Sequence, residues 1–327
     1  MRYPKIINEL NDSMITVVQL VSTISNPIDF IKYYDTIGTV LYFSFIGDDK
    51  SKFTFPKQKG WINVNIIAMT CMCVDVFDDT GEIRPGGEAL NFAAIASKYN
   101  HISVDLLGAI GDDDYGKAIL KSIENKPINK EFIHIISGSA TANHRIYLTE
   151  KGDRYFKDDS WNGGIHDTYL LSDSDKNRIA SADIIFITYD SPNFDDVLEL
   201  RKSCRFQLAV DFNVLRDFKK IETIVPYINF FFISGEKSIL LQFQKWSERY
   251  DNIFNITLAE NGSVTYYMGK EYRVDAVPVN NVIDTTGCGD SYHAGFLCSY
   301  LRDCDIINAM NEGSRVASKT LSHIGGF

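Results

Sequence analysis

The stretch 283–296, IDTTGCGDSYHAGF, places two glycines and an acidic residue directly before an apolar run with helical character. Val282 and Ile283 end an extended segment, and residues 291–302 carry large aromatic side chains at helical spacing. The glycines are therefore predicted to lie at the N-terminus of a helix. Unpaired backbone NH groups and the positive end of the helix dipole make such a terminus suitable for binding an anion.

The residues at this terminus favour one kind of chemistry. Gly287 and Gly289 let the backbone come close to a bound anion, because they have no side chain in the way. Asp290 adds a carboxylate that can accept a proton from an attacking hydroxyl group. An anion hole beside a base suits phosphoryl transfer. The alternative, from these residues alone, is a glycine-rich turn in which Asp290 only caps a helix.

The rest of the chain from Trp61 onward alternates short apolar runs with segments of helical spacing. NVNIIAM precedes ALNFAAIASKY, ISVDLLGAI precedes YGKAILKSI, and ADIIFITY precedes NFDDVLELRKS. The later runs FQLAVDF, INFFFIS and NIFNITLA also indicate buried strands. This alternation predicts an α/β fold with a mostly parallel central sheet and helices on both faces.

A different pattern occurs at residues 143–156, NHRIYLTEKGDRYF, where polar and apolar residues alternate on both sides of a turn at 150–153. The pattern predicts a β-hairpin. We expect a small antiparallel β lid over the site, with elements near residues 76–87 and 143–157. Such a lid would cover a bound ligand.

The chain divides unevenly by composition. It has 327 residues, 45% of them hydrophobic, and can therefore bury a large core. Residues 1–60 do not join the strand and helix pattern, and the segment before Trp61 has the lysine, proline and glycine content of a linker. We assign residues 1–60 to an N-terminal appendage of unknown role and residues 61–327 to the main domain.

Charge and composition narrow the range of partners. The formal net charge of −10 disfavours binding to nucleic acid or anionic membranes. No apolar run is long enough to span a membrane, and the first residues have no apolar signal core. Cys71 and Cys73 form a C-x-C without a second pair of ligands nearby, so reduced thiols are expected in place of a zinc site. These features indicate a cytoplasmic protein that acts on small molecules.

Four segments resemble, in order, the motifs of the ribokinase-like (PfkB) carbohydrate kinases. Residues 284–290, DTTGCGD, are similar to the D-T-x-G-A-G-D signature of that family. Residues 86–91 resemble its sugar-binding G-G-x-x-x-N, and residues 108–116 resemble its G-x-V-G-D-D-x-F-G segment. Residues 257–262, TLAENG, resemble the T-L-G-x-x-G loop of the nucleotide site. The resemblance extends from about residue 66 to the C-terminus and makes a chance match improbable.

The resemblance implies a ribokinase-like fold and a role for each motif. Asp290 would be the catalytic base, and the backbone amides of Gly287, Cys288 and Gly289 would stabilise the charge that develops during transfer. The nucleotide pocket would be lined by four residues, Thr257, Gly262, Gly287 and Gly289.

The sugar site implied by the resemblance contains Asp75, Gly86, Gly87 and Asn91. Asp75 is expected to follow the first strand, and carboxylates at strand ends in α/β sheets commonly meet ligands. Gly86 and Gly87 let backbone amides approach a polyol, and Asn91 offers it both a donor and acceptors. Without the motif, a cap or an exposed turn is the alternative for Asp75 and Asn91.

Cofactors and assembly follow from the same resemblance. It implies ATP and Mg²⁺, assigns no metal ligand in this sequence, and leaves open activation by a monovalent cation and formation of a homodimer. Residues 111–118, GDDDYGKA, nearly match a Walker A loop, but Ala118 replaces the residue that binds magnesium and three aspartates would face the phosphates. We therefore interpret this segment as a loop near the sugar site.

The sequence departs from the family pattern at several positions. Cys288 replaces an alanine, and Ala259 replaces a glycine, which matters only if that position needs a positive φ. Residues 234–237, SGEK, stand where the family has N-x-x-E, a motif tied to magnesium and phosphate, and Glu236 is the candidate substitute. Cys71 and Cys73 stand where relatives often have polar residues, which puts part of the sugar contact in doubt.

Two stretches, GDRYFKDD and the C-terminal GSRVASKTLSHIGGF, most resemble fructoselysine 6-kinases within the family. The expected reaction is ATP-dependent phosphorylation of a sugar amine at its primary 6-hydroxyl. Tyr147, Arg154 and Tyr155 would shape the lid, with a solvated hairpin face as the alternative. A catalytically silent sugar- or nucleotide-binding sensor is the second hypothesis, and a fructokinase or ribokinase is the third.

Overall fold

In the computed structural model, the chain divides into two compact units. The units are Met1–Ile62 with Arg302–Cys304, and Asn63–Leu301 with Asp305–Phe327. In the first unit, β1 (Val17–Val21), β2 (Phe30–Tyr34) and β3 (Val40–Ser44) form an antiparallel sheet in that order. The assignment of residues 1–60 to an appendage stays a prediction. The described residues are 17–21, 30–34, 40–44, 63–69, 71–78, 80–148 and 154–327.

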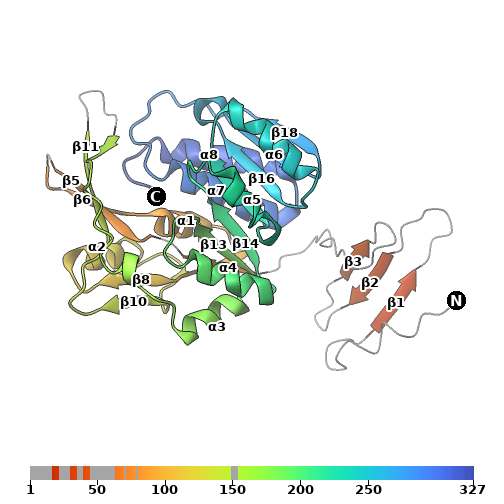
Figure 1. Cartoon of the computed structure of the whole chain (residues 1–327), viewed down its shortest axis with the longest axis horizontal. Coiled ribbons are helices and arrows are strands. Elements are labelled where there is room, and N and C mark those ends of the chain that lie inside the picture. Colours follow the sequence, from red (N-terminus) through yellow and green to blue (C-terminus); the bar gives the residue numbers. More distant parts are fainter. Residues whose placement is uncertain are drawn as a thin grey trace. The chain divides into compact units, whose positions relative to one another are not determined.

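The second unit is built on a sheet that has nine strands among the described residues, in the order β18-β17-β16-β15-β14-β13-β4-β7-β9 (Figure 1). All pairs from β16 to β9 are parallel, and β17 and β18 add an antiparallel edge. The predicted mostly parallel sheet is confirmed. Its strands are β4 (Val64–Ala68), β7 (Ile102–Leu106), β9 (Ile128–Asn129), β13 (Ile184–Thr188), β14 (Gln207–Asp211), β15 (Phe230–Ser234), β16 (Ile253–Thr257), β17 (Ser263–Tyr267) and β18 (Lys270–Val274).

The core lies on both faces of this sheet, as the continuous apolar runs predict. Along β13, Ile184 and Phe186 pack into one hydrophobic cluster, whereas Ile185 and Ile187 pack into another, because successive side chains of a strand point to opposite faces. The first cluster contains residues from α1 (Glu88–Ala96), α2 (Asp114–Ser122), α7 (Cys288–Asp303) and α8 (Ile306–Thr320). The second contains residues from α3 (Asp173–Ser181), α4 (Phe194–Ser203), α5 (Phe218–Glu222) and α6 (Leu240–Ser247).

A smaller four-stranded sheet has the order β12-β11-β5-β6 and stands apart from the large sheet in Figure 1. The predicted hairpin is confirmed, because β11 and β12 pair antiparallel with Tyr147 opposite Tyr155. The turn predicted at 150–153 lies outside the described residues, as do the side chains of Arg154 and Tyr155. The strands are β5 (Cys73–Phe77), β6 (Ile83–Gly86), β11 (Asn143–Leu148) and β12 (Arg154–Phe156).

The remaining elements are short. β8 (Gly108–Gly111) and β10 (Ile133–Ile136) form a parallel pair. Within the described segments, the helices are too short or too polar to cross a bilayer. The 3₁₀ helices are η2 (His166–Thr168), η3 (Val225–Tyr227), η4 (Lys237–Ile239) and η5 (Ala259–Asn261).

Candidate active site

The glycine-rich stretch lies at a helix N-terminus, as its sequence predicts. Helix α7 begins at Cys288, and Gly287 before it has a φ of +67°. A Cβ at Gly287 would lie 2.7 Å from the Cα of Gly326 and 3.0 Å from Nδ2 of Asn91. Both the backbone angle and the close contacts therefore require glycine.

Asp284 fixes the turn that leads into this helix. Its Oδ1 accepts hydrogen bonds from the backbone NH of Thr286 at 2.9 Å and from the Thr286 hydroxyl at 2.6 Å. Its Oδ2 accepts one from the NH of Gly325 at 2.9 Å. The C-terminal segment is thus fastened beside the start of α7.

Asp290 lies in the first turn of α7 and is 9% exposed. Its Oδ2 accepts a hydrogen bond of 2.8 Å from Nδ2 of Asn91, so two motifs that are 199 residues apart meet here. Burial raises the pKa of Asp290 to about 7, the charge of Asp211 acts in the same direction, and the Asn91 hydrogen bond opposes them. A carboxyl group with this pKa can accept a proton near neutral pH.

The residues of the predicted sugar site gather at the start of α1. Gly87 precedes the helix with a φ of +96°, and a Cβ there would lie 2.3 Å from the carbonyl oxygen of Cys71. A Cβ at Gly86 would lie 3.6 Å from Oδ2 of Asp75, which is buried on β5. The backbone NH of Asn91 donates to the Gly87 carbonyl at 3.0 Å, and the side chain of Asn91 donates to Asp290. Asn91 therefore links the glycines of the predicted sugar site to Asp290.

Thr257 and Gly262 lie at the carboxyl end of β16. Thr257 pairs with Ser234 of β15 and with Ser263 of β17, and Gly262 packs against the end of β18. No contact described for these two residues reaches Asp290. The Thr257 carbonyl accepts a 2.9 Å hydrogen bond from the NH of Gly235, and a Cβ at Gly262 would lie 2.1 Å from the Val274 carbonyl oxygen. Ala259 between them has a φ of +51°, so this position does adopt the conformation that favours the glycine of the family pattern.

The rejected Walker A segment has a structural role. Oδ1 of Asp113 accepts a hydrogen bond of 2.8 Å from the NH of Gly116 and caps α2. Its Oδ2 accepts another of 2.8 Å from the NH of Thr141. An aspartate of the segment therefore occupies the helix N-terminus that a phosphate would need.

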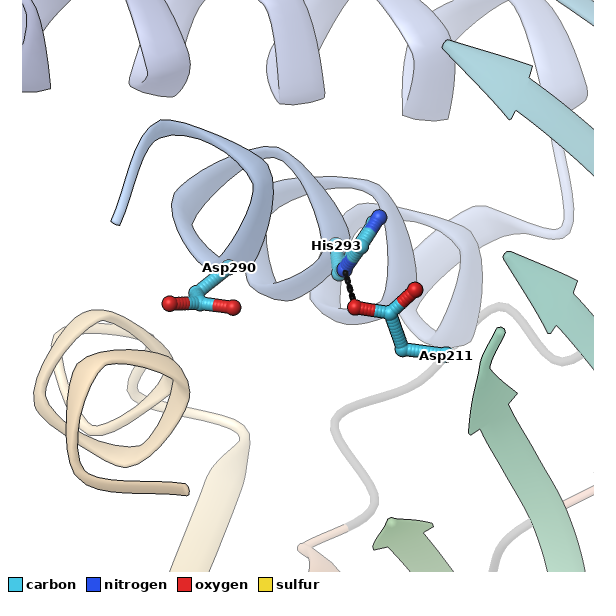
Figure 2. A group of neighbouring side chains, drawn as sticks. All are labelled: Asp211, Asp290 and His293. Atoms are coloured by element: carbon cyan, nitrogen blue, oxygen red, sulfur yellow. Dashed lines mark ion pairs between the residues drawn. The ribbon is translucent and has the colours of Figure 1, made fainter. Parts of the chain in front are cut away.

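The structure adds two residues that were not predicted from the sequence. Asp211, the last residue of β14, and His293, one turn after Asp290 on α7, are 3% and 1% exposed. Figure 2 shows the imidazole next to the Asp211 carboxylate, with 3.5 Å between Nδ1 and Oδ2. Two signals indicated them: Asp211 ends an apolar strand, and His293 follows Asp290 at i+3.

Asp211, Asp290 and His293 each offer one ligand atom, and these atoms lie within 4.8 Å of one another. Such a set can bind a metal ion, but its carboxyl groups can also exchange protons. We treat the three residues as a cluster of two carboxyl groups and a neutral imidazole.

A small cavity at the carboxyl ends of β4 and β7 was also not predicted. One of the residues on its wall is His166, whose pKa is lowered by burial. The cavity is lined by Met69, Leu107, Gly108, Ala109, His166, Tyr169, Ser191 and Asn193.

Comparison with known proteins identifies the family of this chain. The sequence model of the pfkB family of carbohydrate kinases matches residues 74–326. The chain belongs to this family. It is 29% identical to fructoselysine 6-kinase of Shigella flexneri over 258 residues, which are 78% of this chain and 96% of the relative. It is 27% identical to a fructosamine kinase of Bacillus subtilis over 274 residues, 81% of this chain and 93% of the relative.

The fold of this kinase matches solved members of the same class. Ribokinase of Arabidopsis thaliana, in complex with ribose and ATP, has a TM-score of 0.67 at 16% identity, covering 81% of this chain and 94% of the other. The predicted ribokinase-like fold and family are confirmed. The protein is a carbohydrate kinase, and kinases of this family act on small sugars and use ATP, typically with Mg²⁺.

Proposed function

We propose that this kinase phosphorylates the 6-hydroxyl of fructoselysine, with ATP as the donor and Asp290 as the base. The observation that carries the proposal is the contact between Asp290 and Asn91, which joins the anion-binding helix terminus to the sugar motif. The substrate is supported by the names of the two relatives, a fructoselysine 6-kinase and a fructosamine kinase.

The oxygen of the substrate hydroxyl attacks the γ-phosphorus of ATP, and the proton of that hydroxyl passes to the carboxylate of Asp290. The bond from the γ-phosphorus to the bridging oxygen breaks, and ADP leaves with the electron pair. Because the pKa of Asp290 is raised to about 7, the carboxylate is ionised above that pH and is more basic than an exposed aspartate.

The backbone amides at the start of α7 would stabilise the transferred phosphoryl group. Gly289 leaves the approach open, because a Cβ there would meet only His293 Cε1 at 3.9 Å. The NH of Cys288 donates to the Thr285 carbonyl at 3.3 Å, so it must exchange this long hydrogen bond to reach a phosphate oxygen. Burial raises the pKa of the Cys288 thiol to about 11, which keeps it neutral near the phosphates.

Sugar binding is assigned to Asp75, Gly86, Gly87 and Asn91. The amide Oδ1 of Asn91 is buried beside Gly326 and lacks a hydrogen-bond partner among the described residues, so a sugar hydroxyl could pair with it once the C-terminal segment moves aside. Nucleotide binding is assigned to Thr257 and Gly262, with the glycines of α7.

Magnesium would enter with ATP and neutralise charge on its phosphates. Glu236 is exposed at the same sheet edge as Thr257, and a carboxylate is a ligand type that Mg²⁺ prefers, so Glu236 is the residue that suits this role. Lys237, at the position of the family's glutamate, supplies no metal ligand. A monovalent activator and a homodimer stay predictions of the family resemblance.

The test is ADP release with ATP and Mg²⁺ over a panel of fructoselysine, other fructosamines, fructose, ribose and nucleosides. Turnover confined to the fructosamines supports the proposal. Turnover with fructose or ribose alone would replace the substrate and keep the kinase chemistry. Silence over the whole panel, together with thermal stabilisation by ATP, would favour a sensor.

A further inference from the structure

Two buried carboxylates lie next to each other at this site. Asp211 comes from the end of β14 and Asp290 from the first turn of α7, and their ligand atoms are within 4.8 Å (Figure 2). Two ionised carboxylates so close, and shielded from water, raise each other's affinity for a proton. Oδ1 of Asp211 accepts a 2.8 Å hydrogen bond from the NH of Asn213, which fixes its orientation.

In the described part of the chain, the neighbouring elements add further carboxyl groups, and no lysine or arginine acts on the pair. Glu88 on α1 and Asp190 after β13 interact electrostatically with the pair. Burial raises the pKa of Glu88 to about 8, and the nearby carboxylates, Asp290 first, act in the same direction. From α7 itself, Cys288 contributes a neutral thiol. Among the described groups that act on Asp211 and Asp290, the charged ones are carboxylates, so the pair is not neutralised by a salt bridge with lysine or arginine.

His293 completes the cluster without carrying charge. Burial lowers its pKa to about 3, so the ring is neutral at working pH. It stacks on Phe232, with 4.6 Å between ring centroids. Neither ring nitrogen has a hydrogen-bond partner among the described residues, and Nδ1 faces Asp211. The tautomer with its proton on Nδ1 directs an N–H dipole at that carboxylate, which favours its ionised form.

We propose that Asp211 is a positioning residue for the transfer, a second carboxylate that makes Asp290 a stronger base, and that His293 favours the ionised form of Asp211 beside it. The inference rests on Asp290 being the base, as proposed above. It gives a role to a buried acid and a buried histidine that the sugar and nucleotide contacts proposed above do not include.

The first test is the pH profile of kcat/KM for Asp211→Asn, which removes the charge and keeps the shape. Loss of the neighbouring charge should move the acidic limb to lower pH by about one unit. The high-pH plateau should fall, because a weaker base accepts the proton less readily. The control is Asp175→Asn, which replaces a fully buried carboxylate that caps α3. The acidic limb of its pH profile should match that of the wild type. An unshifted limb in Asp211→Asn overturns the inference.

The second test does not depend on that variant folding. Carboxyl carbon NMR of the full wild-type chain, labelled at aspartate and free of metal ions, should show two coupled titrations well above the ordinary aspartate range. Asp290→Asn should lower the titration midpoint of Asp211, because the interaction is reciprocal. Independent titrations near the ordinary aspartate pKa would overturn the inference.

A third variant tests the histidine. His293→Phe keeps an aromatic ring against Phe232 but removes the N–H, so Asp211 should titrate at higher pH. An unchanged Asp211 midpoint would exclude His293 from the proposal. These outcomes differ from failure of the proposed function, in which Asp290→Asn itself would keep its turnover.

Discussion

At the scale of single residues, Gly287 combines a φ of +67° with a site for Cβ that is 2.7 Å from the Cα of Gly326. Gly287→Ala must therefore displace the C-terminal segment or Asn91, which donates a hydrogen bond to Asp290. We expect a loss of kcat of at least about tenfold, since small displacements of reacting groups are costly. Steady-state kinetics of the folded variant measure it.

Gly81→Ala is the matched control, because Gly81 also has a φ of +67° and a Cβ there would contact nothing within 4 Å. It bears the same backbone strain without the clash, so it should lose about 1 kcal/mol of stability and keep its kcat. Equal kcat values in the two variants would contradict the steric account.

Ala259 adopts a φ of +51° in the loop after β16, a conformation that costs a non-glycine residue about 1 kcal/mol. Ala259→Gly should therefore increase the free energy of unfolding by up to about 1 kcal/mol. This gain is measured as a higher urea midpoint. Ala182→Gly is the control, since Ala182 has a φ of −75° and a glycine there should destabilise. A lowered midpoint for Ala259→Gly would show that the loop does not hold this strain.

The motif residues that the structure brings together around Asp290 could be identified from the sequence, but the neighbouring Asp211 and His293 could not. The glycines, Asp290 and Asn91 could be identified because each follows a spacing with a chemical reason. Asp211 ends an apolar strand just as Asp75 belongs to one, yet many strands end in acids that face only water. Which strand ends lie beside α7 depends on the order of strands in the sheet, and that order is a property of the tertiary fold.

At the scale of elements, helix α7 is fixed to the sheet by polar contacts as well as by packing. The Tyr292 hydroxyl donates to Oγ of Ser263 at 2.8 Å and accepts from Nδ2 of Asn255 at 3.1 Å. Tyr292→Phe removes both hydrogen bonds and leaves Ser263 and Asn255 buried without the tyrosine hydroxyl. The change should cost about 1 to 3 kcal/mol of stability. Denaturant unfolding measures the loss. No change in stability would show that these bonds do not help to hold the helix.

The elements themselves were largely predictable, and their long-range pairings were not. Apolar runs predicted β13, β14 and β15, because strands buried on both faces need apolar residues at every position. The alternating pattern predicted the β11–β12 hairpin. The parallel pairing of β5 with β11, with His144 opposite Asp75, joins segments about 70 residues apart, and no local pattern encodes it.

At the scale of the whole molecule, the acidic cluster should make stability depend on pH. The pKa values of Asp211 and Asp290 are raised to about 7 in the folded state, above those of the unfolded chain near 4. The folded state therefore binds more protons between these values, and the free energy of unfolding falls as pH rises through this window. Calorimetry should show a lower Tm at about pH 8 than at about pH 5 from this contribution.

Asp211→Asn should reduce this pH dependence and raise Tm at about pH 8 relative to the wild type, because it removes a charge that burial destabilises. At about pH 5, where the wild-type carboxyl is protonated, the two Tm values should be similar. A lower Tm for the variant at about pH 8 would mean that the ionised carboxylate stabilises the fold, contrary to this account.

The most direct measurement of the central claim is the turnover of Asp290→Asn with fructoselysine, beside Asp303→Asn at the far end of the same helix. The account predicts a loss in kcat of about 100- to 10,000-fold for Asp290→Asn, with ATP affinity retained and Asp303→Asn near the wild type. Near-normal turnover in folded Asp290→Asn would contradict the assignment of this residue as the base.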